Sequence, residues 1–416
     1  MRSSRRLWLL PVAILVALTS MASTPAPPTL RLGALFPLTG PLAPLAQQEF
    51  LGVQIAQQMV NSQGGVDGRQ IELDTRVLDY PQQAPAAVAS LAADHVPAIL
   101  GTYSSSLSIP ASQAASNAGI TYWEAGAVAD QVTGRGLPGV YRIGANGTTL
   151  GSNSANFAAA ELAPRLGKTA QQLRIVVVYE DDAYGSSVAN AAIATAHNNG
   201  SQVVDVIPYN PYVPDWHTVF AKLGTDQADV IVLASYILDG AAFRESMLAA
   251  HLHVGALIGS TMAECYPDFG DILGKDAVGV FASDRPDGWV NYDLLSQPAR
   301  SATDTFNDIW KAKTGTAPTE EGLAGFTAAW ALFHDVLPRA HSFTSLDINA
   351  AADSTVEPTG SLPNGGGIRF SLSGADRGQN LDAIGVIWQW QAPYHETTVW
   401  PPAYAWGPIK LVPLPR

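Results

Sequence analysis

The chain has 416 residues, of which 47% are hydrophobic, so it is long enough to bury more than one core, and we expect two domains. Its formal net charge of −13 argues against nucleic acid or an anionic membrane surface as a partner, because both attract basic patches. The single cysteine excludes an internal disulfide, and stability must therefore come from buried apolar surface.

The first 22 residues have the pattern of a secretory signal peptide. Arginines precede an apolar run at residues 7–18, and the small residues Ser20 and Ala22 follow it. The run is too short to cross a bilayer, and no cysteine stands near the cleavage point to carry a lipid. We expect residues 1–22 to be removed and residues 23–29 to form a proline-rich spacer. The mature protein is then periplasmic or extracellular and not a lipoprotein, and two adjacent arginines leave twin-arginine export open beside ordinary secretion.

Short apolar runs alternate with alanine-rich segments of helical length along the rest of the chain. The expected strands cover residues 30–35, 71–78, 96–100, 119–123, 173–179, 202–207, 230–234, 256–258 and 278–281. The expected helices cover residues 47–61, 84–94, 108–117, 150–166, 186–199, 216–223, 240–251, 299–314 and 322–337. This alternation predicts an α/β fold with doubly wound lobes, in which parallel sheets are flanked by helices.

The order of strands and helices starts again near residue 147, which predicts a crossing between two similar lobes. We expect residues 30–146 and 284–365 to form lobe 1 and residues 147–283 to form lobe 2. The last section, residues 366–416, departs from the alternating pattern and is expected to contain a hinge return and a tail on lobe 2. Its four tryptophans are expected to pack this tail onto a lobe rather than to touch a ligand.

A glycine and a run of three serines stand between a predicted strand and a predicted helix at residues 101–106. Open α/β sheets bind ligands at the carboxyl ends of their strands, which is where these serines lie. Free N–H groups at a helix start, together with hydroxyls, form a site for an anion. The segment therefore indicates a site for a small anionic or zwitterionic molecule, and a helix N-cap with spare serines explains the same residues equally well.

The motifs of the common enzyme classes are missing. The chain has no Gly-x-Ser-x-Gly elbow, no phosphate-binding loop and no His-Glu-x-x-His. His251 and His253 lie among no clustered acids, so we expect surface histidines rather than metal ligands. The acids at residues 180–182 are expected to form a solvated loop, and the alternative that one of them orients the nearby Tyr184 stays open. We expect no catalytic residue, no metal and no cofactor.

A series of short motifs runs from residue 38 to residue 401. The motifs lie at residues 38–41, 47–52, 61–68, 101–106, 110–112, 133–136, 141–142, 184–185 and 399–401. Their order and spacing resemble the Leu/Ile/Val-binding branch of the type I periplasmic substrate-binding proteins. The resemblance implies two α/β lobes joined by a three-strand hinge that closes on a ligand like a Venus flytrap. It also implies a monomer that delivers an amino acid, such as a branched-chain one, or a related carboxylate to the permease of an ABC transporter.

The resemblance assigns the lobe 1 half of the ligand site. It places the ligand carboxylate at Ser105, with Ser106 beside it. In the family, small residues and a threonine at the end of the next strand complete a polar cradle. Here Gly126 offers its N–H group, and Val128 replaces the threonine.

Three further lobe 1 residues depart from the family pattern. Glu124, next to Trp123, is an unexpected carboxylate at the site and is interpreted as part of a different ligand chemistry. An early-loop tyrosine of the amino-acid receptors falls near Leu45, and Phe326 replaces a tyrosine on a late helix of lobe 1. These changes make the expected pocket more apolar than that of the amino-acid receptors.

From lobe 2, the resemblance assigns Tyr184 as the tyrosine that closes over the ligand and Tyr236 as another wall. The family's amino-acid receptors hold the ligand ammonium with an acid, and this chain has Thr261 at that position and Glu264 three residues later. If Glu264 reaches the pocket, the ligand keeps an ammonium group. If it does not, an amine-free carboxylate or a small amide is the better candidate. The same fold also serves receptors that sense a ligand instead of transporting it, and the sequence leaves this alternative open.

Overall fold

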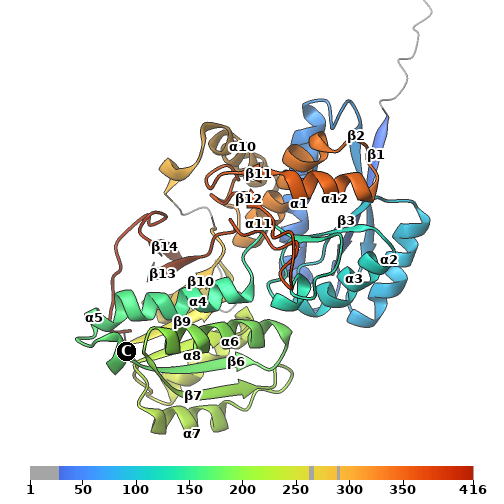
Figure 1. The fold of residues 1–416 in the computed structure, drawn as a ribbon. Helices are drawn as coiled ribbons and strands as arrows, with labels where there is room; N and C mark the ends of the chain where they lie inside the picture. The colour runs from blue at the N-terminus through green and yellow to red at the C-terminus, as the bar shows by residue number, and fades with distance from the viewer. Residues whose placement is uncertain (1–27, 262–266, 288–290, 416) are drawn as a thin grey trace, which may run out of the picture.

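The computed structural model describes residues 28–261, 267–287 and 291–415. The predicted signal peptide, Cys265 and Glu264 lie outside this part of the chain. The described residues form two lobes, with the N-terminal strands in one and the C-terminal tail in the other (Figure 1). No helix among them is long and apolar enough to cross a membrane.

Lobe 1 is built on a parallel sheet of five strands in the order β2-β1-β3-β4-β5. Its strands are β1 (Thr29–Phe36), β2 (Gln70–Val77), β3 (Ala98–Gly101), β4 (Thr121–Glu124) and β5 (Val140–Arg142). Its helices are α1 (Ala43–Ser62), α2 (Ala84–Ala93), α3 (Ser105–Asn117), α10 (Gln297–Thr314), α11 (Glu320–Trp330) and α12 (Ser345–Ser354). The short pair β11 (Val356–Glu357) and β12 (Ile368–Arg369) completes it.

Lobe 2 has a sheet of seven strands in the order β14-β13-β10-β9-β8-β6-β7. β13 runs antiparallel to both of its neighbours, β10 and β14, and the other neighbouring strands pair in parallel. Its strands are β6 (Arg174–Glu180), β7 (Gln202–Tyr209), β8 (Val230–Ala234), β9 (Ala256–Ser260), β10 (Phe281–Asp284), β13 (Val386–Ala392) and β14 (His395–Trp400). Its helices are α4 (Gly147–Phe157), α5 (Ala163–Arg165), α6 (Ala183–Asn198), α7 (Trp216–Asp226), α8 (Ile237–Ala249) and α9 (Asp268–Leu273). The prediction of two α/β lobes with parallel sheets is confirmed.

The chain passes between the lobes three times, after β5, after β10 and between β12 and β13. The third passage begins later than the residue 366 at which the tail was expected to start. Phe370 still packs on Trp123 and Tyr141 in lobe 1, because an aromatic side chain of this size is stabilised by burial in that core.

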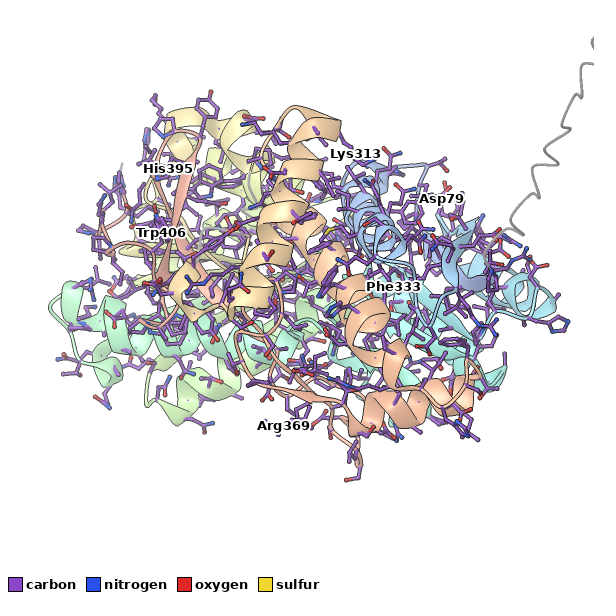
Figure 2. The ribbon with its side chains drawn as sticks, turned by 90° about the horizontal axis from the view of Figure 1, so that it is seen from above. Asp79, Lys313, Phe333, Arg369, His395 and Trp406 are labelled. Atoms are coloured by element: carbon purple, nitrogen blue, oxygen red, sulfur yellow. The ribbon has the colours of Figure 1, made fainter. Side chains whose placement is uncertain are left out.

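The tail, residues 386–415, packs onto lobe 2 through tryptophans. Trp388 and Trp390 are fully buried in β13, whereas Trp406 is 56% exposed. Figure 2 places Trp406 and His395 together in the tail, while Asp79 lies at the far side of lobe 1.

The core of lobe 1 depends on a close contact between α1 and α11. A side chain on Gly52 would collide with the carbonyl oxygen of Gly322 and the N–H of Phe326. The two helices therefore approach backbone to backbone, and Phe326 stacks on Phe306 beside them with ring centroids 4.3 Å apart. This contact places the start of α11 under the cleft between the lobes.

We predict that Gly52→Ala lowers the free energy of unfolding by about 1 to 3 kcal/mol, because the added methyl group overpacks the contact between α1 and α11. The control is Gly224→Ala, since Gly224 lies in α7 with open space around its Cα. There alanine is the better helix former, and we expect a gain of about 0.5 to 1 kcal/mol. Denaturant unfolding of both variants measures the difference, and equal stabilities would contradict the proposed contact.

Candidate functional site

A small cavity lies between the lobes at the carboxyl ends of strands from both sheets. Its lining residues are Tyr103, Ser105, Gly126 and Val128 from lobe 1 and Tyr184, Tyr236 and Thr261 from lobe 2. The cavity volume is about 10 Å³, which is close to the space that one water molecule needs. The lobes are therefore closed on each other at this point.

The structure brings together five of the residues that the sequence assigned to the site, namely Ser105, Gly126, Val128, Tyr184 and Tyr236. Four others do not line the cavity, namely Ser106, Trp123, Glu124 and Phe326. Glu264 lies outside the described residues. Tyr103 also lines the cavity, although the sequence motifs predicted no role for it. Its position directly before the serine run is the signal that could have found it.

The serine run is part of the first turn of α3, which begins at Ser105 rather than at the expected residue 108. Ser105 is 2% exposed, and its Oγ accepts a hydrogen bond of 3.0 Å from the N–H of Ala129. A hydroxyl that accepts in this way keeps its own hydrogen for a ligand acceptor. Ser106 is exposed, and its Oγ lies 2.9 Å from that of Ser104. Of the two predicted anion contacts, Ser105 is the one that faces the cavity.

Residues 125–129, which we call the cleft loop, are held from beneath by Glu124. Its carboxylate accepts hydrogen bonds from the N–H groups of Gly126 at 3.0 Å and Ala127 at 2.8 Å. It also accepts from the hydroxyls of Ser108 and Tyr122. Burial raises the pKa of Glu124, and these hydrogen bonds partly offset the rise. The N–H of Gly126 is thus already bonded, which corrects its expected role as a ligand donor.

Two arginines bind the carbonyl groups of the cleft loop. Arg142 donates to the carbonyl oxygens of Ala127 at 3.1 Å and Ala129 at 2.7 Å. Arg285, directly after β10, donates to the carbonyl of Gly126 at 2.8 Å. Both guanidinium groups are almost completely buried. The cleft loop is therefore rigidly positioned by charged side chains that do not face the cavity.

Trp123 and Phe326 are core residues of lobe 1. Trp123 donates from Nε1 to the carbonyl oxygen of Ala328 at 2.8 Å, and its ring packs on Tyr141. Because side chains alternate along a strand, Trp123 and Glu124 face opposite sides of the sheet. Neither of these directions leads into the cavity.

The lobe 2 wall consists of two tyrosines whose rings pack edge to face, with centroids 5.3 Å apart. Tyr184 is 2% exposed, and its hydroxyl bonds the carbonyl oxygens of Ser235 and Ser260 within lobe 2. Tyr236 lines the same cavity beside it. The lobe 2 wall thus presents two aromatic rings to the cavity.

Hydrogen bonds join the lobes next to the cavity. The carboxylate of Asp130 accepts from the N–H of Thr148 at 3.0 Å and from its hydroxyl at 2.8 Å. The N–H of Asp130 donates to Ser187 at 3.0 Å, and the N–H of Gly147 donates to the carbonyl of Val128 at 2.7 Å. Lobe 2 residues at the starts of α4 and α6 therefore bind the segment that contains the cleft loop.

Of the three acids at residues 180–182, Asp181 is exposed as expected, whereas Glu180 and Asp182 are not part of a solvated loop. Glu180 is 6% exposed, and burial raises its pKa to about 8. Asp182 is the N-cap of α6, with its carboxylate accepting from the N–H of Gly185 at 2.7 Å. This cap holds the helix turn that carries Tyr184.

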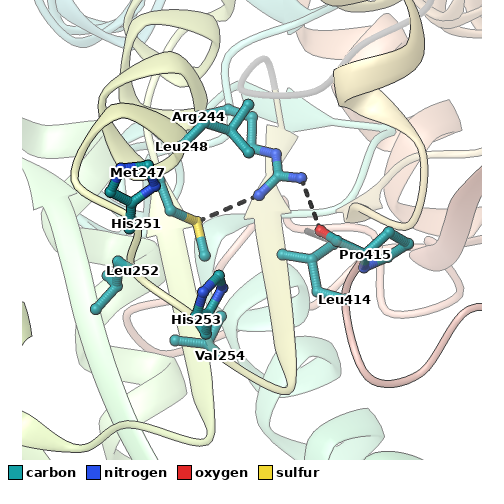
Figure 3. Close-up of a pocket in the computed structure, with 9 residues that line it drawn as sticks. All are labelled: Arg244, Met247, Leu248, His251, Leu252, His253, Val254, Leu414 and Pro415. Atoms are coloured by element: carbon teal, nitrogen blue, oxygen red, sulfur yellow. Dashed lines mark hydrogen bonds between the residues drawn. The ribbon is translucent and has the colours of Figure 1, made fainter.

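A second pocket lies on lobe 2, away from the cleft, and is lined by residues of α8, the loop after it and the tail (Figure 3). Arg244 donates there to the carbonyl oxygen of Pro415 at 3.2 Å and contacts the sulfur of Met247. His251 and His253 line the same pocket. Within the described residues, no group of histidines, cysteines and acids is arranged to hold a metal ion. The hydrogen bond from Arg244 to Pro415 links α8 to the tail.

We predict that Glu124→Ala destabilises the free protein, because it leaves the buried N–H groups of Gly126 and Ala127 unpaired. The expected cost is about 1 to 3 kcal/mol for each group. Glu124→Gln keeps an oxygen acceptor at the same place and is expected to stay within about 1 kcal/mol of the wild type. Thermal unfolding compares the two variants, and equal losses would argue against the role of the carboxyl oxygen.

Comparison with known proteins shows the family of this chain. The family model described as "periplasmic binding protein" matches residues 29–376. Leu/Ile/Val-binding protein homolog 8 of Brucella suis is 31% identical over 377 residues, which are 90% of this chain and 92% of the relative. Homolog 7 of the same organism is 28% identical, with 96% of this chain and 98% of the relative covered.

Solved structures have the same fold. A leucine-binding protein of Thermotoga maritima matches with a TM-score of 0.75 and 20% identity, covering 89% of this chain and 98% of its own. A substrate-binding protein of Streptococcus pneumoniae in complex with isoleucine has a TM-score of 0.71, 18% identity and coverages of 90% and 100%. A solute-binding protein of R. palustris in complex with benzoate has a TM-score of 0.71, 18% identity and coverages of 89% and 95%. With its two lobes and the cavity between them, the chain belongs to the periplasmic binding protein family.

Proposed function

We propose that this protein is the exported receptor of an ABC importer and traps a small amino acid or a related carboxylate between its lobes. The observation that carries the proposal is the convergence of residues from both lobes on one cavity at the strand ends. Relatives that are named Leu/Ile/Val-binding protein homologs support the ligand class. The predicted signal peptide supports a location outside the cytoplasm, where such a receptor meets its ligand.

The carboxylate of the ligand is bound at Ser105 and the first turn of α3. The helix start adds N–H groups and a positive dipole end to the serine hydroxyl. Charge-assisted hydrogen bonds of this kind contribute about 1.5 to 3 kcal/mol each, so no lysine partner is required.

Closure of the hinge couples binding to the approach of the lobes. A ligand that touches Ser105 on lobe 1 and the ring of Tyr184 on lobe 2 makes both contacts only when the cleft is closed. Such a ligand therefore shifts the hinge equilibrium toward the closed form. The closed form exposes one defined surface of both lobes, which is what a membrane permease can recognise. The ligand is bound and released unchanged, and its recovery after incubation with the protein tests this point.

The part of the ligand opposite its carboxylate is less polar than in an amino-acid receptor. Among the described lining residues, no carboxylate side chain faces the cavity, and the lobe 2 position expected to hold an acid is Thr261. Val128 adds an apolar wall with Tyr184. A ligand ammonium buried in this wall without a partner would be costly, so a carboxylate without an amine or a small amide is favoured unless Glu264 supplies the anion.

We predict that Ser105→Ala weakens ligand binding by about tenfold to a hundredfold, because a charge-assisted hydrogen bond is lost. The same change leaves the N–H of Ala129 unpaired, so a smaller loss of stability is expected as well. Ser301→Ala is the matched control, since Ser301 is exposed on α10. Calorimetric titration with the ligand that co-purifies with the protein measures the change. Unaltered affinity in Ser105→Ala would place the anion contact elsewhere.

We predict that titration with leucine and with its amine-free keto acid separates the two ligand classes. A preference for leucine that is lost in Glu264→Gln is expected if Glu264 binds the ammonium. A preference for the keto acid, unaffected by that substitution, is expected if the pocket has no anion for an amine. The second result would exclude an amino acid as the natural ligand.

A further inference from the structure

Several carboxyl side chains are buried together beneath the cleft loop. Glu49 of α1, Glu320 and Glu321 of α11 and Asp284 of β10 each have no exposed surface. Acidic residues are rarely buried to this extent unless they are paired with cations. The cation that lies among them is Arg285.

Arg285 forms an ion pair with Glu320. Its Nε lies 2.6 Å from one carboxylate oxygen of Glu320, and its Nη2 donates to the other at 3.0 Å. Its Nη1 donates to the carbonyl of Gly126, and Asp284 is farther away at 3.7 Å. Arg285 and Glu320 thus form a two-point ion pair.

Glu49 and Glu321 are the acids of this cluster whose carboxyl oxygens are buried and make no hydrogen bond within the described residues. Of the two, Glu49 is the one that lies against the cleft loop. The absence of a side chain on Gly126 makes room for the Glu49 carboxyl group, because a Cβ there would collide with Glu49 Oε2. On the other side, the backbone of Glu49 lies against Gly325 of α11. Glu49 is therefore enclosed between the cleft loop and α11.

We propose that Glu49 is an internal proton-binding site and that its neutral form holds the cleft loop against α1. In the neutral acid, the carboxyl group packs against Gly126 with no charge to be solvated. When the proton is lost, a negative charge forms in a closed space that offers no donor. The contact between Glu49 and the cleft loop is then destabilised, because an unpaired buried charge is far more costly than a neutral polar group.

Burial and the charged groups around Glu49 together raise its pKa. Burial is the largest cause, and it raises the pKa of Glu49 well above its ordinary value. Arg285 lowers the pKa, while Glu124 of β4 and Glu321 of α11 raise it again. Burial raises the pKa of Glu321 to about 7, so its charge forms over the neutral range and adds to the repulsion.

The sign of the pH dependence follows from proton binding. The folded protein keeps the Glu49 proton in a pH range where the unfolded chain has released it. Stability from this group is therefore complete at pH values below the ordinary carboxyl pKa and is lost as the pH rises toward the folded pKa. The proposal concerns the fold around the cleft loop and is independent of which ligand binds.

The test is thermal unfolding of the ligand-free protein between about pH 5 and pH 8, in the wild type and in Glu49→Gln. Glutamine has the shape of the neutral acid and cannot ionise. We expect the melting temperature of the wild type to fall toward pH 8. The melting temperature of Glu49→Gln should fall less over the same range, by a difference of at least about 2 °C. Glu72→Gln is the matched control, because the Glu72 side chain is 52% exposed on β2, and its curve should follow the wild type. Parallel curves for Glu49→Gln and the wild type would overturn the proposal.

A second variant and a local measurement keep the test decisive. Glu49→Met is a neutral side chain of similar size, and it should give the same flattened curve. If neither variant folds, the proposal is also overturned, because a site for a neutral acid should accept a neutral replacement. At about pH 8, hydrogen exchange of the peptide containing the cleft loop should be slower in Glu49→Gln than in the wild type, and equal rates would refute the link to the loop.

Discussion

The cleft depends on the binding of a backbone loop by the buried guanidinium of Arg142. This side chain donates to two carbonyl groups of the cleft loop and, through Nε, to Gln379 at 2.7 Å. Gln379 in turn donates to the carbonyl of Gly144 at 3.1 Å, where the chain first leaves lobe 1. Burial lowers the pKa of Arg142 to about 10, so it stays charged at neutral pH. One side chain therefore couples the binding loop to two of the three passages between the lobes.

The charged and the neutral polar groups of the site have separate roles. Glu124, Arg142 and Arg285 bind the backbone of the cleft loop from the side of lobe 1, while hydroxyls and tyrosine rings line the cavity. Hydrogen bonds to charged groups are stronger than those between neutral groups, so they define the position of the loop. A neutral lining is compatible with an anionic ligand, because no negatively charged side chain of the described lining repels it.

The closed arrangement is stabilised by contacts that do not involve a ligand. Asp130 binds the start of α4, and Ser187 of α6 binds the segment after the cleft loop. A hydrogen bond to a carboxylate contributes about 1.5 to 3 kcal/mol, and a neutral one about 0.5 to 1.5 kcal/mol. A ligand that contacts both lobes adds to these contacts, and it shifts the hinge equilibrium by its difference in affinity between the open and closed forms.

The sequence by itself determined the fold class, because periodic apolar runs specify strands and helices locally and their alternation specifies parallel sheets. It also indicated Ser105, which follows a strand end where open α/β sheets bind ligands, while the family resemblance of its motifs indicated Tyr184 and Tyr236. Only the tertiary structure decided that Trp123 and Phe326 belong to the core, that Glu124 binds the cleft loop, and that Glu49 and Arg285 lie beneath it. The physical reason is that a side chain's partners depend on packing between segments far apart in the chain, which local patterns do not encode.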